Sequence, residues 1–163
     1  MCIRRPKKNE SQKENYSGKK KRHTHKSLII SDKDKKILAI SPLYIGKNHD
    51  FNIFKNEKIE ELFSPKKPVY LDNGFEGVHK LRNDINFRKP KKKRKNKKLN
   101  GGEKLGNRLI SKVRVKVEHA ISGIKKFGIV SKVNRMINHS RDTVFKIACG
   151  LWNLSLNKES STC

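Results

Sequence analysis

Cysteine is scarce in this chain, and its three cysteines lie far apart. Cys2, Cys149 and Cys163 form no Cys-x-x-Cys pair, so the sequence predicts neither a disulfide framework nor a zinc ribbon. Long apolar runs are also missing, and without a stretch of about 18 apolar residues no membrane span is expected. The first eight residues lack the apolar region of a secretion signal. These absences predict a cytoplasmic protein with reduced cysteines.

Acidic residues are few compared with basic ones. The 163 residues include 41 Lys and Arg but only 15 Asp and Glu, a formal net charge of +26, and 33% are hydrophobic. The length suffices for one domain with a modest core, although the apolar content is low for a compact domain. The positive excess predicts attraction to phosphate backbones, with an affinity that falls steeply as salt rises. A lysine-biased genome is the alternative source of the charge, but eight of the ten residues from Lys89 to Lys98 are Lys or Arg, and bias does not explain that clustering.

The apolar pattern predicts an α/β layer fold. Strands are expected at residues 23–31, 37–41 and 69–72, the first two joined as an antiparallel hairpin. Helical segments are expected at residues 50–54, 57–63, 77–85, 102–127 and 141–157. Residues 1–21 are polar, basic and without periodicity, so they are expected to be extended or poorly ordered.

The two longest predicted helices each carry apolar residues at helical spacing. In the helix at 102–127 the predicted buried stripe is Leu105, Leu109, Val113, Val117, Ile121 and Ile124. In the helix at 141–157 it is Val144, Ile147, Leu151 and Leu154, and either Ser140 or Asp142 is expected to cap the helix start.

Two carboxylates stand in suggestive places. Asp72 ends the short apolar run Val69-Tyr70-Leu71, and Glu118 lies within the helix at 102–127. A strand-end carboxylate and a helix carboxylate suit two-metal phosphoryl transfer, in which acidic side chains hold two divalent ions about 3.5–4 Å apart. Each has a simpler explanation: an Asp beside Asn73-Gly74 often caps a turn, and a surface Glu can pair with Arg114 or Lys125 on its helix.

Several motifs occur together and in one order. They are YSGKKKRHTHK from Tyr16, NHD from Asn48, VYLDNGFEG from Val69 and NRLISKVRVKVEHAISGIKKFGI from Asn107. In this order and spacing they resemble the DDE transposases of bacterial insertion sequences, in the branch of DDE superfamily endonucleases related to Harbinger-type transposases. The resemblance runs from about Ile3 to about Leu156.

The resemblance implies a fold and a chemistry. It implies a partial ribonuclease H-like fold that lacks its first strand and ends in C-terminal helices. Asp72 and Glu118 match the second and third catalytic carboxylates, which would hold Mg²⁺ or Mn²⁺. The family's first Asp matches no residue between Met1 and Tyr16. We therefore expect weakened metal binding and a chain that is inactive alone, as the C-terminal fragment of a transposase.

The resemblance also assigns roles around the carboxylates. His49, Asp50 and Asn107 match residues near the site and are expected to be structural. The residues expected to contact DNA are Lys19, Lys20, Lys21, Lys91, Lys92, Lys93, Arg94, Lys95, Arg108 and Arg114. Contacts of Lys89–Lys98 would be independent of sequence, because lysines reach phosphates rather than base edges. His23 and His25 are expected on one strand face, at the surface or toward DNA.

The predicted organisation has three parts: a basic N-terminal segment at 1–21, a partial catalytic domain at 22–157 with a basic loop at 89–98, and a tail at 158–163. The expected function is metal-dependent DNA cleavage and strand transfer by the parent transposase. The alternative is a catalytically dead, basic DNA-binding module that interferes with an intact transposase or associates with itself. A ribosomal-type RNA-binding protein fits the ordered motifs poorly. A nucleoid-associated location in the cytoplasm follows from the DNA partner.

Overall fold

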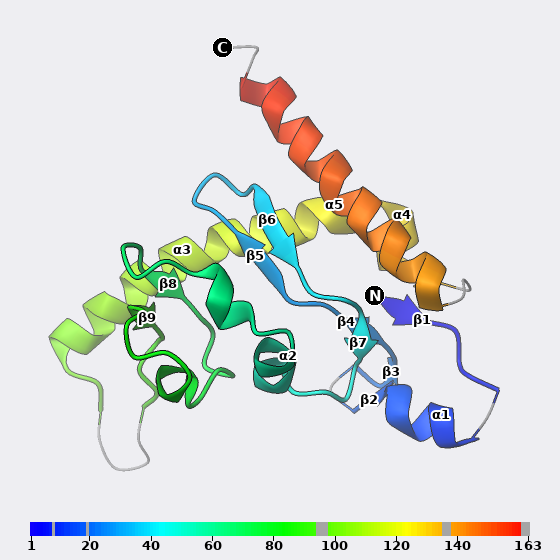
Figure 1. Ribbon diagram of the computed structural model, residues 1–163, viewed down its shortest axis with the longest axis horizontal. Coiled ribbons are helices and arrows are strands. Elements are labelled where there is room, and N and C mark those ends of the chain that lie inside the picture. Colours follow the sequence, from blue (N-terminus) through cyan, green and yellow to red (C-terminus); the bar gives the residue numbers. More distant parts are fainter. Residues whose placement is uncertain (8, 19, 94–97, 135–137, 161–163) are drawn as a thin grey trace. The chain divides into compact units, whose positions relative to one another are not determined.

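The computed structural model describes residues 1–7, 9–18, 20–93, 98–134 and 138–160, and the chain forms two compact units (Figure 1). The terminal unit combines Met1–Asn48 with Val117–Cys163, and the central unit is His49–Lys116. Helix α3 (Gly101–Lys126) gives its first part to the central unit and its last part to the terminal unit. Small sheets with C-terminal helices confirm the predicted α/β class.

The terminal unit is built from short paired strands and three helices besides the end of α3. Its strands are β1 (Cys2–Ile3), β2 (Tyr16–Ser17), β3 (Arg22–His23), β4 (His25–Lys26), β5 (Ile29–Ser31), β6 (Ile37–Ile40), β7 (Tyr44–Ile45) and β10 (Val133–Asn134). Its helices are α1 (Asn9–Asn15), α4 (Gly128–Ser131) and α5 (Asn138–Ser160). Strands β2 and β3, β4 and β7, and β5 and β6 pair antiparallel, whereas β1 and β10 pair parallel. Within the described residues each sheet has two strands.

The predicted antiparallel hairpin is present as β5 and β6. Ile29 pairs with Ile40, and a bulge follows Ile30. The turn is held by Asp32, whose Oδ1 accepts hydrogen bonds from the backbone N–H groups of Asp34 at 2.8 Å and Lys36 at 2.9 Å. The first predicted strand, at 23–31, is divided among β3, β4 and β5 instead of running unbroken.

Helix α5 packs on this hairpin and forms the core of the terminal unit. Phe145, Ala148 and Cys149 of α5 are buried against Ile37 of β6 and Ile124 of α3. Asn153 holds the strand by both backbone groups of Ile37: its Oδ1 accepts from the Ile37 N–H at 2.8 Å, and its Nδ2 donates to the Ile37 carbonyl at 2.9 Å. The side-chain amide thus completes the hydrogen bonding of a strand edge.

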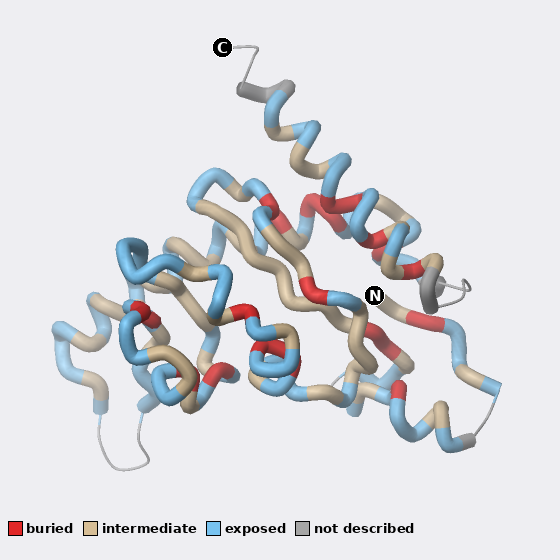
Figure 2. Tube along the Cα trace, viewed as in Figure 1, coloured by how far each residue is buried: buried red, intermediate tan, exposed pale blue. Residues whose placement is uncertain are grey.

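The buried stripe predicted for α5 is wrong. Side chains of Ile147, Leu151 and Leu154 are 55%, 46% and 60% exposed, and Figure 2 shows exposed and half-buried residues along the outer part of this helix. Two apolar sets on α5 satisfy helical spacing, and the set containing Phe145 and Ala148 is the one that packs. The capping role predicted for Asp142 is also wrong: α5 begins earlier, and the Asp142 carboxylate accepts from the Leu43 backbone N–H at 2.8 Å.

Helix α3 matches its predicted range closely, but its buried face is shorter than predicted. Leu105 and Leu109 are exposed, and burial is confined to Ala120, Gly123 and Ile124 near the end of the helix. At Gly123 the Trp152 ring of α5 comes so close that an added Cβ would lie 2.1 Å from a ring carbon. Gly123 therefore permits the contact between α3 and α5.

The central unit has its own aromatic core. Its elements are α2 (Asp50–Asn56), η1 (Ile59–Leu62), β8 (Val69–Tyr70), η2 (Val78–Lys80), β9 (Phe87–Arg88) and the first part of α3. Phe54 lies at the centre, with its ring edge-on to Phe75 at 5.5 Å and to Phe87 at 6.5 Å, and stacked on Phe63 at 6.3 Å. The predicted helices at 57–63 and 77–85 are single 3₁₀ turns, η1 and η2.

Residues 1–21 contain β1, α1 and β2, whereas the sequence predicted no regular element there. Residues of this segment enclose His25, which was expected at the surface and is instead buried. Its Nε2 lies 2.8 Å from Asn15 Oδ1, and burial, with Arg141 nearby, lowers the pKa of His25 to about 4. His25 is thus a neutral interior residue at physiological pH. No helix in the described part of the chain is long and apolar enough to cross a membrane.

We predict that Gly123→Ala destabilises the protein and that Gly106→Ala on the same helix does not. A methyl at 123 meets the Trp152 ring, whereas one at 106 meets nothing within 4 Å. Overpacking should cost about 1–3 kcal/mol at 123, and replacing Gly by Ala in a helix should contribute roughly 1 kcal/mol of stability at 106. Urea unfolding of both variants measures this. Equal midpoints for the two would contradict the close contact.

Candidate active site at the end of strand β8

Asp72 lies two residues beyond the end of β8, and the parallel pairing of β8 with β9 determines its position. Val69 and Tyr70 pair with Phe87 and Arg88 of β9, and the Leu71 N–H extends the ladder by donating to the Arg88 carbonyl at 2.9 Å. The next residue, Asp72, leaves the ladder. The adjoining Phe75 ring is buried in the aromatic core, so the turn that carries Asp72 is anchored on both sides.

The Asp72 carboxylate takes part in a turn and an ion pair. Its Oδ1 accepts a hydrogen bond from the Asn73 backbone N–H at 2.6 Å, and its carbonyl accepts from the Phe75 N–H at 3.2 Å. The Arg114 guanidinium of α3 lies 3.5 Å from the same Oδ1. The Asp72 side chain is 57% exposed and the Arg114 side chain 36% exposed. An ion pair this exposed is weak, so the carboxylate stays open to a competing cation.

Glu118 lies on α3, four residues beyond Arg114, and is exposed. Residues four apart on a helix are neighbours on its surface, so Glu118 lies one turn from the arginine that pairs with Asp72. The unit boundary falls between Lys116 and Val117, which places Glu118 in the terminal unit and Asp72 in the central unit. The convergence of these two carboxylates stays a prediction.

The candidate site offers carboxylate oxygens as ligands for a divalent metal. Carboxylate oxygens such as those of Asp72 suit Mg²⁺ or Mn²⁺. Among the described residues, however, no three His, Cys, Asp or Glu side chains gather in a group that could hold a metal ion. The described residues therefore do not make up a complete metal site.

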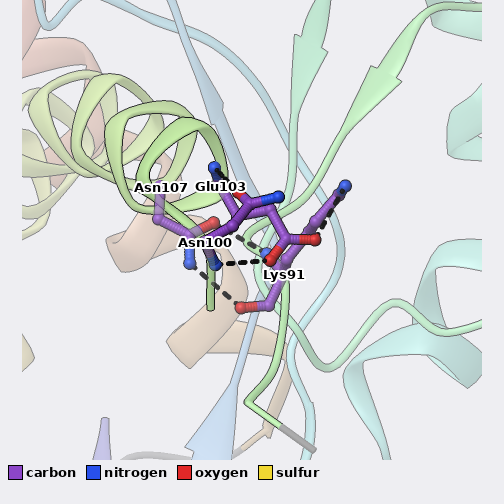
Figure 3. A network of polar contacts seen from close by, with 4 residues as sticks. All are labelled: Lys91, Asn100, Glu103 and Asn107. Carbon is purple, nitrogen blue, oxygen red and sulfur yellow. Dashed lines mark hydrogen bonds and ion pairs between the residues drawn. The ribbon is translucent and has the colours of Figure 1, made fainter. Parts of the chain in front are cut away.

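Asn107 fastens the start of the basic loop to α3 (Figure 3). Its Oδ1 accepts from the Lys91 backbone N–H at 2.8 Å, and its Nδ2 donates to the Lys91 carbonyl at 3.0 Å. One turn earlier, Glu103 and Asn100 form a reciprocal cap: the Glu103 N–H donates to Asn100 Oδ1 at 2.7 Å, and the Asn100 N–H donates to Glu103 Oε2 at 3.1 Å. Helix α3 therefore holds both ends of the segment from Lys91 to Asn100.

A cavity of about 510 Å³ opens at the base of this loop, beside the Asp72 turn. Its lining residues are Asn73, Glu76, Lys89, Pro90, Lys91, Lys92, Lys98, Leu99 and Glu103. Sequence reasoning missed Asn73, Glu76 and Glu103 as parts of the site. The spacing Asn-x-x-Glu before a helical pattern is a capping signal that could have located Glu103, but nothing in the sequence marks Glu76.

His49 and Asp50 lie at the start of α2, where the sequence predicted a short helix, and their structural role near the site stays a prediction. The His49 carbonyl accepts from the N–H groups of Asn52 at 3.0 Å and Ile53 at 3.2 Å. Within the described residues the His49 side chain makes no capping bond, so its contribution to the helix start comes from its backbone. Asp50 places a negative charge in the first turn, where the helix dipole favours it.

The other predicted DNA contacts are divided between the two units. Lys20 and Lys21 are exposed in the turn between β2 and β3 of the terminal unit. Lys91, Lys92, Lys93 and Arg108 are exposed in the central unit. Lys19, Arg94 and Lys95 lie outside the described residues. Their roles stay predictions.

Comparison with known proteins establishes the class. Residues 1–153 match the family described as DDE superfamily endonuclease. The chain therefore belongs to this family, as its motif order predicted, and its kinship is with the transposases of insertion sequences.

A curated relative supports the same kinship. The chain is 34% identical over 155 residues to the probable transposase for insertion sequence element IS702 of Microchaete diplosiphon. The alignment covers 94% of this chain and 54% of that protein, so the chain spans about half the length of the relative it matches. No solved structure matches the chain.

We predict that Asn107→Ala frees the start of the basic loop without unfolding the central unit. The substitution removes both hydrogen bonds to the Lys91 backbone, and each such bond contributes about 1 kcal/mol net. Amide hydrogen exchange should quicken at Lys91 and stay unchanged at Phe87 in β9. Arg108→Ala, a neighbouring exposed position, is the control. Unchanged protection at Lys91 would show that the loop is held by something else.

Proposed function

We propose that this chain supplies part of the catalytic machinery of a DDE transposase, whose activity is cleavage of DNA at element ends followed by strand transfer. Membership of the DDE superfamily endonucleases carries the proposal. The name of the curated relative, a probable transposase of an insertion sequence, agrees with it. DNA is the proposed partner, and the charge of +26 supports attraction to it.

Asp72 and Glu118 are the carboxylates we assign to catalysis. Asp72 is supported by its place beyond the β8 ladder, on an anchored turn with an exposed carboxylate. Glu118 is supported by its position one turn from Arg114, which reaches Asp72. We propose that both belong to a ribonuclease H-like arrangement. The parallel pair β8 and β9 beside α3 would then be part of its sheet and helix layers.

Endonucleases of this family generally use divalent metals. When bound, such an ion supplies charge neutralisation at the scissile phosphate and activates the attacking oxygen. In the proposed site the Asp72 and Glu118 carboxylates would contribute oxygen ligands. We propose that they hold the ion weakly, because the sequence motifs provide two of the three acidic residues for which the family is named.

Arg114 is proposed to change partners during DNA binding. In the structure it neutralises Asp72 at 3.5 Å. A guanidinium also binds a phosphate through two parallel hydrogen bonds. A phosphate approaching Asp72 could therefore draw Arg114 away, which leaves the carboxylate available to a cation. Arg108, Lys20 and Lys21 would hold the DNA backbone, and Lys91–Lys93 would do so from the loop.

We predict that Mn²⁺ broadens the amide NMR signals around Asp72 and around Glu118 together. Both carboxylates would contribute to one ion site, so the paramagnetic ion would lie near both. Asp72→Asn should remove the broadening at both places, because a lost charged ligand weakens a site for a hard cation. Asp84→Asn, an exposed carboxylate paired with Arg82 in the same unit, is the control. Broadening at Asp72 alone would refute the joint assignment.

We also predict that the chain binds DNA without cleaving it. A supercoiled plasmid incubated with the chain and Mg²⁺ or Mn²⁺ should show no more nicking than with Asp72→Asn. An active transposase of the family on its own element ends serves as the positive control. Metal-dependent nicking that disappears in Asp72→Asn would show that the chain completes a catalytic site. DNA binding without such nicking agrees equally with the second candidate, a DNA-binding module, for which the exposed lysines provide the surface.

A further inference from the structure

The cavity at the base of the basic loop is lined by more positive than negative side chains, and two carboxylates already pair with its lysines. Four lysines line it, at 89, 91, 92 and 98, together with Glu76 and Glu103. Lys91 pairs with Glu103 at 3.3 Å, and Lys92 pairs with Glu76. Lys89 donates to the Phe75 carbonyl at 3.0 Å. Lys89, Lys91 and Lys92 thus each meet an oxygen acceptor, as they would beside a phosphate.

The two glutamates differ in how firmly they are held. Glu103 caps α3 through the Asn100 N–H and is 28% exposed, so its carboxylate belongs to the helix start. Glu76, in the turn after Asp72, is 72% exposed, and its carboxylate pairs with Lys92, which lines the same cavity. The hydrogen bond from Lys92 lowers the pKa of Glu76, which keeps it ionised. An exposed ion pair exchanges partners readily.

We propose that Glu76 occupies the place of a DNA backbone phosphate, and that a phosphate entering the cavity displaces it from Lys92. Displacing Glu76 leaves the α3 cap intact, because Glu103 carries the cap. The inference rests on the proposed function, and it adds a phosphate site and a residue, Glu76, that restrains DNA binding.

The position of the cavity favours DNA over a free anion. Asn73 lines the cavity, and its backbone N–H donates to the Asp72 carboxylate. A phosphate held there would place the adjoining strand beside the carboxylate assigned to catalysis. Lys93, exposed just beyond Lys92, continues the row of cations. A polyanion can neutralise several cations at once and release their counterions, which a single small anion cannot do.

The test measures duplex binding by fluorescence anisotropy across a series of salt concentrations. The variants are Glu76→Gln, Lys92→Gln and the double variant, with Glu61→Gln as the control. Glu61 is an exposed glutamate of the same unit that does not line the cavity, so it reports the effect of net charge alone. Circular dichroism confirms that each variant keeps its fold.

Removing the competing carboxylate should raise DNA affinity about two- to fivefold for Glu76→Gln, in line with the strength of an exposed ion pair. Glu61→Gln should raise it less. Lys92→Gln should reduce the slope of log affinity against log salt by about 0.9, the loss of one phosphate contact. In the Lys92→Gln background the gain from Glu76→Gln should fall to that of Glu61→Gln, the effect of net charge alone, because Glu76 and Lys92 act as a pair.

Three results would overturn the proposal. The first is an equal gain from Glu76→Gln and Glu61→Gln, and the second is a gain that persists without Lys92. The third is selective competition by inorganic phosphate at constant ionic strength, which would identify a small-anion site. Failure of the unaltered chain to bind duplex DNA at all would instead contradict the proposed function, and the phosphate site with it.

Discussion

The attachment of extended segments to the two long helices depends on backbone hydrogen bonds that asparagine side chains supply. Strands of two to four residues leave most of their edges unpaired. Asn153 of α5 grips both backbone groups of Ile37, and Asn107 of α3 grips both backbone groups of Lys91. Each clamp satisfies both polar groups of one residue's backbone and attaches an extended segment to a helix, and at Ile37 these groups are partly buried, where an unpaired group is costly. The same device occurs in both units.

The shortage of acidic residues gives each one near the candidate site a structural task. Asp72 holds its own turn and meets Arg114, Glu103 caps α3 and meets Lys91, and Glu76 meets Lys92. These contacts offset repulsion among the lysines at the base of the loop. They are all exposed or half-exposed, so each is weak by itself. None of these contacts involves the buried aromatic core of the same unit, where Phe54 packs on Phe75 and Phe87.

The local pattern of apolar residues predicted several helices and strands correctly, but it predicted the wrong buried face for α5. The hairpin of β5 and β6, helix α2 and both long helices follow from apolar spacing and breakers, which act over a few residues. The buried face of α5 does not, because Ile147 and Leu151 satisfy the same period as Phe145 and Ala148. Only contact with Ile37 and Ile124 selects between the two faces. His25 shows the same limit, since its hydrogen-bond partner is Asn15 and the charge of Arg141 helps to lower its pKa, and neither residue is a neighbour in sequence.

The sequence by itself determined the family, the basic character and the two motif carboxylates, because these are properties of residue order and composition. The tertiary structure decided which groups meet. It brought Arg114 to Asp72 across 42 positions of sequence. It also brought Glu76, in the turn that follows β8, to Lys92, which follows β9. Such pairs depend on where a ladder and a helix place their side chains, and a short-range pattern contains no information on that. The physical reason is that charges attract at contact distance in space, whatever their separation along the chain.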